Sequence, residues 1–354
     1  MSQKQISVGG VRIGGGAKVS IQSMTNTPTH DVEKTLAQIR ALATAGCEVV
    51  RLAVPDMEAA LAIEAIKQDS PLPIVVDIHF DYRLALACIE RGADKVRINP
   101  GNIGDSMRVK EVALSCKKRN IPIRIGVNGG SLEKEILGKY GKVTAQGLVD
   151  SAFSHIALLN QFDFDDICIS LKSSSVPLTM KAYEIMARES DYPLHLGITE
   201  AGTMHMGTIK SAIGIGGLLA LDIGDTLRVT LTADPVAEIA VAKDILKAVG
   251  LRKEGVELIA CPSCGRTKID LISLAEEVER GLADISKPLT VAVMGCMVNG
   301  PGEAKAADCG IAGGDGEGLL FAKGEIIKKV PQEQLVAELF ALIETLSIEE
   351  PLTN

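Results

Sequence analysis

Short β-branched segments alternate with longer helical patterns through the first 250 residues, and this alternation constrains the fold more than any other feature. Eight such segments occur, at residues 19–24, 49–54, 74–80, 95–100, 121–128, 166–172, 194–200 and 225–231. Strict alternation of strand and helix predicts parallel strands joined by crossover helices. Eight units in about 230 residues match the number and length of a closed (β/α)8 TIM barrel.

An open, doubly wound sheet is the rival arrangement, since it also alternates strands and helices. In dinucleotide-binding sheets of that kind a G-x-G-x-x-G motif follows the first strand, and this sequence has no such motif there. We therefore favour the barrel for residues 1–250. The glycine-rich segment 6–16 reads as a hairpin that precedes the first barrel strand.

The rest of the chain, residues 251–354, predicts a second and smaller α/β domain after a charged linker. Its expected elements are strands at 256–264 and 289–296, helices at 266–282 and 332–346, a loop at 297–310 and a hairpin at 313–329.

Composition excludes several classes of function. The net charge of −8 gives no global attraction to nucleic acid, and a chain with no Trp and ten Phe plus Tyr offers few platforms for stacking bases. The start of the chain lacks the pattern of a signal peptide, and the most apolar run, residues 212–221, is too short to cross a bilayer. We therefore expect a cytoplasmic protein whose cysteines are free or metal-bound.

Cationic side chains lie within five of the eight predicted strands, where a parallel sheet should be almost continuously apolar. They are Arg51, Arg97, Arg124, Lys172 and Arg228. A single one could pair with a carboxylate for purely structural reasons, but five from separate strands favour an anionic ligand at the carboxyl end of the barrel. Because arginine suits phosphate oxygens, we expect a small phosphorylated or diphosphorylated substrate.

Strand alternation places polar residues on the same faces as these cations. The partners are Asn99, Asn128, Ser170 and Thr230, with Asp77 and His79 on the third strand and Glu200 at the end of the seventh. Glu200 is the best-placed carboxylate for acid–base work. The ordinary alternatives are that His79 only donates a hydrogen bond at the barrel rim and that Glu200 only pairs with an arginine.

Four of the eight cysteines gather in the second domain: Cys261, Cys264, Cys296 and Cys309. A zinc ribbon needs a second C-x-x-C, and a thioredoxin-like dithiol leaves Cys296 unexplained. An iron–sulfur cluster tolerates irregular spacing, so spacing alone makes Cys309 the natural fourth ligand. The remaining four, Cys47, Cys88, Cys116 and Cys168, fit buried small hydrophobes.

The segments "CPSCGRTKID" and "GCMVNGPGEAKAADCGIAGG" resemble those of the bacterial 4-hydroxy-3-methylbut-2-enyl diphosphate synthase family. The likeness extends over the whole chain, including "SMTNTPT", "VRINPGN", "RIGVN" and "SLKSS". It implies a TIM barrel followed by a domain that carries a [4Fe–4S] cluster. The implied ligands are Cys261, Cys264, Cys296 and Glu303, which replaces Cys309 as the fourth.

The resemblance also implies a reaction of the methylerythritol phosphate route to isoprenoids. Two electrons open the ring of 2-C-methyl-D-erythritol 2,4-cyclodiphosphate, and a hydroxyl group leaves as water. The five barrel cations would hold the diphosphate with Asn128 and Thr230, Glu200 would donate the proton, and His79 and Asp77 would position the substrate. The implied partners are flavodoxin or ferredoxin and a second copy of the chain in a head-to-tail homodimer.

A basic patch of Arg266, Lys268 and Lys305 is expected near the cluster for an acidic electron carrier, although these residues could equally be solvated surface. Two other functions compete with this interpretation. One is a barrel aldolase or synthase acting on a sugar phosphate, with structural zinc in the second domain. The other is an iron–sulfur or redox sensor that binds a phosphorylated metabolite.

Overall fold

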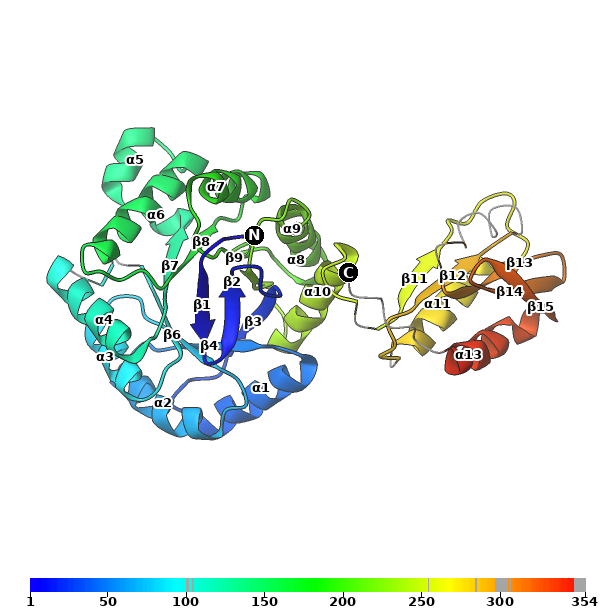
Figure 1. Cartoon of the computed structure of the whole chain (residues 1–354), viewed down its shortest axis with the longest axis horizontal. Helices are drawn as coiled ribbons and strands as arrows, with labels where there is room; N and C mark the ends of the chain where they lie inside the picture. Colours follow the sequence, from blue (N-terminus) through cyan, green and yellow to red (C-terminus); the bar gives the residue numbers. More distant parts are fainter. Residues whose placement is uncertain are drawn as a thin grey trace. The chain divides into compact units, whose positions relative to one another are not determined.

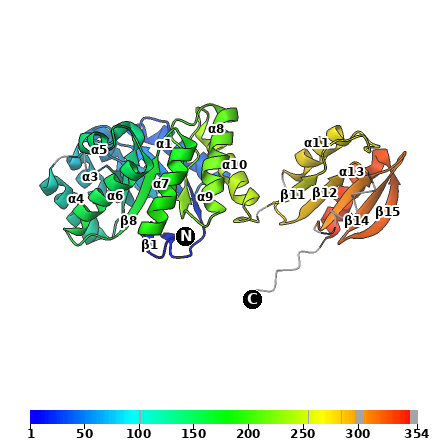
Figure 2. The same cartoon turned by 90° about the horizontal axis from the view of Figure 1, so that it is seen from above.

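The computed structural model describes residues 1–99, 102–103, 105–253, 255–283, 285–296, 305 and 307–346. The chain divides into two compact units, Met1–Leu251 and Arg252–Asn354. Figures 1 and 2 colour the first unit from blue to green and the second from yellow to red. In the described part of the chain, no helix combines the length and apolar character of a membrane span.

Eight parallel strands form the barrel of the first unit, which confirms the predicted fold class. Around the barrel their order is β8-β7-β6-β5-β4-β3-β10-β9, and a bridge between Ile169 and Leu194 joins the two end strands. The strands are β3 (Ser20–Met24), β4 (Val49–Ala53), β5 (Ile74–Asp77), β6 (Lys95–Ile98), β7 (Ile123–Asn128), β8 (Ile167–Lys172), β9 (His195–Leu196) and β10 (Thr226–Leu227).

Helices surround this barrel in Figure 1. They are α1 (Val32–Ala45), α2 (Met57–Asp69), α3 (Tyr82–Glu90), α4 (Ser106–Arg119), α5 (Lys134–Tyr140), α6 (Ala145–Asn160), α7 (Val176–Glu189), α8 (Met204–Ser211), α9 (Gly217–Leu219) and α10 (Pro235–Ala248), with a short 3-10 turn at Gly129–Ser131 and a π-helical turn at Ala212–Gly216. Several start at an aspartate whose side chain accepts a backbone N–H of the first turn, as Asp56 and Asp234 do. These caps fix where each helix begins after its strand.

Two apolar layers hold the barrel. Outward-facing strand residues such as Val50, Leu52 and Ile125 pack against the helices in one continuous buried cluster. The hairpin of β1 (Gln5–Val8) and β2 (Val11–Gly14) supplies a second cluster, in which its isoleucines and valines contact Val49, Val75 and Cys168. The predicted hairpin is present, and its apolar face covers the inner surface at one level of the barrel.

The second unit is a five-stranded mixed sheet with helices packed on one face. Its elements are β11 (Glu257–Ala260), α11 (Leu271–Leu282), β12 (Thr290–Met294), β13 (Cys309–Gly313), β14 (Glu317–Ala322), β15 (Glu325–Pro331), a 3-10 turn at Gln332–Gln334 and α13 (Leu335–Thr345). The strands follow the order β11-β12-β13-β14-β15, with β11, β12 and β13 parallel. Val278, Leu335 and Leu339 of the helices pack against Val291 and Ile311 of the sheet.

Strand β13 begins at Cys309, which the sequence analysis placed in a loop. The residues of β13 are mostly small, so their sequence pattern does not resemble that of a strand. Close packing requires a glycine at position 310, because a Cβ there would lie 2.3 Å from the carbonyl oxygen of Ala292 on the neighbouring strand.

Candidate active site

Beyond the level that the hairpin covers, the inner surface of the barrel is polar and charged instead of apolar. Strand residues that alternate with the outer apolar set face inward, and they include Lys95, Arg97, Arg124, Lys172 and His195, all of them buried. The interiors of such barrels are commonly filled by branched apolar side chains. Here stability is carried by the outer apolar cluster, and the interior is left for polar chemistry.

All nine residues predicted to bind substrate line one cavity of about 170 Å³ in the barrel interior. They are Arg51, Asp77, His79, Arg97, Arg124, Asn128, Lys172, Arg228 and Thr230, and Ser170 and Thr199 complete the lining. The prediction that these side chains converge rested on the rule that alternate residues of a strand face the same side, and the structure does bring them together.

Asp77 is the carboxylate in the centre of this cationic group. Its Oδ1 accepts a hydrogen bond from Arg97 Nη1 at 3.0 Å, while Arg51 Nε and His79 Nε2 lie 3.8 and 3.5 Å from Oδ2. Burial alone would raise the pKa of Asp77, but the attraction of Arg51, His79 and Arg97 outweighs it and holds the pKa well below its usual range. Asp77 therefore stays ionised and fixes two arginines.

Arg124 differs because its Nε and Nη1 have no hydrogen-bond partner among the described residues, although the side chain is 1% exposed. Burial, followed by repulsion from Arg97, lowers the pKa of Arg124 to about 10. Burial and then repulsion from Arg124 hold the pKa of Lys172 well below its usual value. An anion in the cavity would remove both penalties, since it would pair with cations that are already desolvated.

A larger cavity of about 520 Å³ adjoins the first, with which it shares His79, Arg97, Asn128 and Thr199. Its other polar lining is mostly uncharged and includes Asn99, Asn102, Ser173 and Ser174. Such amides and hydroxyl groups suit the hydroxyl groups of a ligand better than its phosphates.

Glu200 lines this second cavity and is exposed. Its backbone φ is +52°, a left-handed conformation that is uncommon for a residue with a side chain. Strain of this kind collects at functional sites, where the surrounding fold holds it in place. Among the described residues no ion pair is formed by Glu200, so the structure does not support the alternative that it merely pairs with an arginine.

In the second unit, Cys261 and Cys296 follow two adjacent parallel strands at their carboxyl ends. Ala260 pairs with Val293, so both cysteines leave the sheet at the same edge. The sulfur of Cys261 accepts a hydrogen bond from the backbone N–H of Gly295 at 3.1 Å. The loop with Cys264 folds over the same edge, because Lys268 N donates to Gly295 O.

These sulfur atoms have the chemistry of cluster ligands. Cys264 is exposed, and hydrogen bonds from the backbone and side chain of Arg266 lower its pKa, which favours the thiolate. A backbone N–H donated to sulfur, as at Cys261, is one of the interactions that tune iron–sulfur centres. Glu303 lies outside the described residues, and among those described no three Cys, His, Asp or Glu side chains converge as metal ligands.

Cys309 does not fit the ligand position that spacing alone favoured. It starts β13 opposite Val291, at the edge where β12 begins, whereas Cys296 lies beyond the end of β12. It is fully buried in the apolar cluster beneath the helices, and burial raises the pKa of its thiol to about 12. Burial also raises the pKa of Cys47, Cys88, Cys116 and Cys168, in agreement with their interpretation as core residues.

The expected basic patch is divided between the two edges of this sheet. Arg266 and Lys268 lie in the loop at the cysteine edge. Lys305 lies beside Gly324 in the β14–β15 turn, and that turn joins the opposite edge through Lys323 N, which donates to Asp308 O. The prediction that all three residues form one patch is therefore wrong.

Sequence reasoning missed several charged and polar groups. Lys95 lies two residues before Arg97 on the same strand, so the parity that identified Arg97 could have found it. His195, whose two ring nitrogens have no partner in the described structure, could have been found in the same way. Glu238 and Met24 also contact the site cations, but neither carried such a signal, because Glu238 comes from a helix and Met24 is uncharged.

Comparison with known proteins places both units in one family. The family model described as "GcpE TIM-barrel domain" matches residues 3–243, and "GcpE protein C-terminal domain" matches residues 257–345.

Two curated relatives, from Caldanaerobacter subterraneus subsp. tengcongensis and Clostridium perfringens, are each 60% identical to the chain. The alignments cover 98% and 97% of the chain and 98% of each relative, and both relatives are named 4-hydroxy-3-methylbut-2-en-1-yl diphosphate synthase (flavodoxin). A third relative with this name, from Geobacter sulfurreducens, is 58% identical, with 98% of both sequences covered.

Solved structures resemble the barrel fold alone. A dihydropteroate synthase from Coxiella burnetii is 13% identical with a TM-score of 0.51, covering 70% of this chain and 99% of that one. A 3-dehydroquinate dehydratase from Geobacillus kaustophilus is 16% identical with a TM-score of 0.50, and the match covers 70% of this chain and 98% of that one.

The substitution Lys95→Met tests whether the buried positive charge lowers stability. The Nζ atom of Lys95 has no partner in the described structure, and burial, followed by repulsion from Arg124 and Arg51, lowers its pKa to about 8 from 10.5. At pH 7 we expect the variant to raise the free energy of unfolding by about 2 kcal/mol, because it removes an unpaired buried cation.

The pH dependence has a definite sign. Between pH 8 and 10.5 the unfolded chain holds a proton that the native Lys95 has released, so wild-type stability rises with pH relative to the variant. Thermal unfolding should therefore show a gain for Lys95→Met that shrinks across this window. The exposed Lys118→Met is the control, and a variant less stable than wild type at every pH would contradict the argument.

Proposed function

The chain belongs to the GcpE family, and from that premise we propose that it catalyses the reductive ring opening of 2-C-methyl-D-erythritol 2,4-cyclodiphosphate to 4-hydroxy-3-methylbut-2-en-1-yl diphosphate. It is an iron–sulfur oxidoreductase of isoprenoid precursor synthesis that receives electrons from flavodoxin. We place it in the cytoplasm, where thiols stay reduced. The observation that carries the proposal is the cationic cavity in which two guanidinium nitrogens of Arg124 have no hydrogen-bond partner among the described residues.

The smaller cavity suits the diphosphate. Arg124 and Lys172 are desolvated cations that form no ion pair within 4 Å among the described residues, while Asp77 holds Arg51 and Arg97 in place. A cyclic diphosphate brings two negative charges and several acceptor oxygens to these donors. Asn128 and Thr230, which line the same cavity, add uncharged donors around it.

The larger cavity suits the carbon skeleton of the substrate and its hydroxyl groups. Its neutral amides and hydroxyls can bind hydroxyl groups, and Glu200 lies at its wall. When the ring C–O bond breaks, one end of the diphosphate is freed into the cation site while its other end stays bonded to carbon, and a hydroxyl group must take up a proton to leave as water. Two electrons balance this step. We assign the proton donation to Glu200 and substrate positioning to His79 and Asp77.

We propose that a [4Fe–4S] cluster is held by Cys261, Cys264, Cys296 and Glu303. The exposed, thiolate-favouring Cys264 and the N–H donated to Cys261 support this assignment, and Glu303 enters it through the family resemblance. When bound, such a cluster supplies electrons one at a time and a Lewis-acidic iron. Its carboxylate ligand would be weaker than a thiolate.

A head-to-tail homodimer completes the proposal. The linings of the two barrel cavities contain no cysteine, so electrons must reach them from a C-terminal unit. We propose that this unit comes from a second copy of the chain, which makes each active site composite.

An anaerobic assay tests the reaction directly. Reconstituted full-length protein, the cyclodiphosphate and reduced flavodoxin should yield the linear allylic diphosphate, followed by phosphorus NMR. Arg124→Ala should raise KM for the substrate and keep the visible spectrum of the cluster. A colourless protein with stoichiometric zinc and no turnover would contradict the proposal and support the barrel aldolase.

Single cysteine substitutions test the ligand set. Cys264→Ala should lose the iron content and visible absorption of the reconstituted protein, because the exposed thiolate is a ligand. Cys309→Ala should keep them, since this thiol is buried at the other edge of the sheet. The reverse pattern would restore the assignment that spacing favoured.

Mixing two variants with complementary defects tests the composite site. Cys264→Ala keeps an intact barrel and Arg124→Ala keeps an intact cluster unit. After subunit exchange we expect about a quarter of wild-type activity, because half of the dimers are mixed and each has one intact site. Activity that stays at the level of the separate variants would indicate sites built within one chain.

A further inference from the structure

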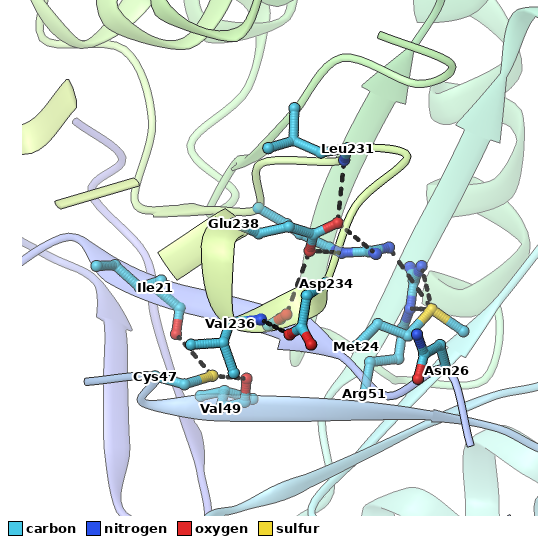
Figure 3. Close-up of polar contacts among 12 residues, drawn as sticks. Ile21, Met24, Asn26, Cys47, Val49, Arg51, Leu231, Asp234, Val236 and Glu238 are labelled. Atoms are coloured by element: carbon cyan, nitrogen blue, oxygen red, sulfur yellow. Dashed lines mark hydrogen bonds and ion pairs between the residues drawn. The ribbon is translucent and has the colours of Figure 1, made fainter. Parts of the chain in front are cut away.

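Two residues outside the predicted site, Met24 and Glu238, hold two of its arginines. Figure 3 labels both of them together with Arg51. Glu238 on α10 contacts Arg228, and the sulfur of Met24 at the end of β3 lies between Arg228 and Arg51. We propose that Glu238 and Met24 are positioning residues that set the spacing of Arg51 and Arg228 for the diphosphate. The inference rests on the proposed function.

Glu238 is a buried carboxylate with several donors. Its Oε2 accepts from Ser23 Oγ at 3.2 Å and from Arg228 Nε at 3.4 Å. Its Oε1 accepts from the backbone N–H of Leu231 at 3.0 Å and from Arg228 Nη2 at 3.4 Å. The carboxylate thus ties β3, the Arg228 side chain and the segment that carries Thr230 to one point.

The position of Glu238 is itself fixed by the start of α10. Asp234 caps this helix by accepting the N–H of Val236 at 2.8 Å, and Glu238 follows in the first turn. A carboxylate near a helix amino terminus is also favoured by the helix dipole. The side chain of Glu238 is 4% exposed, so it acts on the substrate through Arg228 and not by contact.

Met24 provides a different kind of contact. Its sulfur lies 3.1 Å from Arg51 Nε, 2.9 Å from Arg51 Nη2 and 3.5 Å from Arg228 Nη1. A thioether is a weak acceptor, whereas phosphate oxygens are strong ones for guanidinium groups. Met24 therefore keeps two like charges around one atom and yields their N–H groups when a diphosphate arrives.

Five side chains form one line of contacts. Asp77 lies beside Arg51 at one end, and Glu238 holds Arg228 at the other, with the Met24 sulfur between the two guanidinium groups. Each arginine thus contacts one carboxylate and shares the Met24 sulfur as a weak acceptor. This arrangement directs the donors of both toward the cavity that they line.

The test separates position from charge. Glu238→Asp keeps the negative charge but shortens the side chain, and we expect about tenfold weaker binding of inorganic pyrophosphate by full-length protein, measured by calorimetry. We expect the same increase in KM for the cyclodiphosphate with kcat changed less than about threefold. Unchanged binding by Glu238→Asp would overturn the proposal, as would tighter binding by Glu238→Gln, which would show that Glu238 only offsets charge.

Glu48→Asp is the matched control, because Glu48 Oε2 also binds β3 but at the backbone N–H of Ile21 near the start of the strand. It should lower thermal stability and leave pyrophosphate binding unchanged. If it weakens binding as much as Glu238→Asp, the effect is general damage to β3 and the proposal fails.

A second pair of variants tests the sulfur. Met24→Gln supplies a strong acceptor that competes with phosphate, so it should weaken pyrophosphate binding more than Met24→Leu; equal binding would overturn the role of Met24. Pyrophosphate binding needs no turnover, so these outcomes stand apart from the assay of the proposed reaction.

Discussion

The main physical constraint on the barrel unit is the burial of several positive charges in a fold whose interior is usually apolar. Lys95, Arg97, Arg124 and Lys172 are all buried within it, and they repel one another as well as losing hydration. The cost of this arrangement must be met by the apolar contacts between strands and helices and by the hairpin of β1 and β2. Binding a diphosphate reverses part of the penalty, so the strain in the free protein becomes selectivity for multiply charged anions.

The second unit handles its reactive groups in the opposite way. Cys309 is fully buried, and desolvation raises the pKa of its thiol, which disfavours the thiolate. Cys264 is exposed and receives hydrogen bonds, so its thiolate is favoured. Burial thus distinguishes Cys309 from Cys264, whereas Cys296 is itself buried and differs from Cys309 in the end of the sheet at which it lies. Sequence spacing contains neither kind of information.

Strand parity explains how far the sequence could predict the site. Because alternate residues face inward, the charged and polar positions on the strands identified nine side chains that line one cavity. The same rule fails for Glu238, which reaches the site from the first turn of α10. Alternation does place Met24 on the same face as its register partner Arg51, but an uncharged side chain gave no reason to select it. The rule also fails for Cys309 and Lys305, because the end of the sheet at which they lie becomes clear only once β13 is recognised as a strand.

Asp77 and Glu238, the two carboxylates that contact the site cations, restrain some of the arginines and leave the N–H groups of another without a partner. Asp77 engages Arg51 and Arg97, and Glu238 engages Arg228, so these three have restricted geometry before any ligand enters. Arg124 keeps two unpartnered nitrogens within the described structure. A ligand in this cavity would therefore meet three arginines already held by carboxylates and one with unpartnered nitrogens, which favours a compact diphosphate that can satisfy all of them at once.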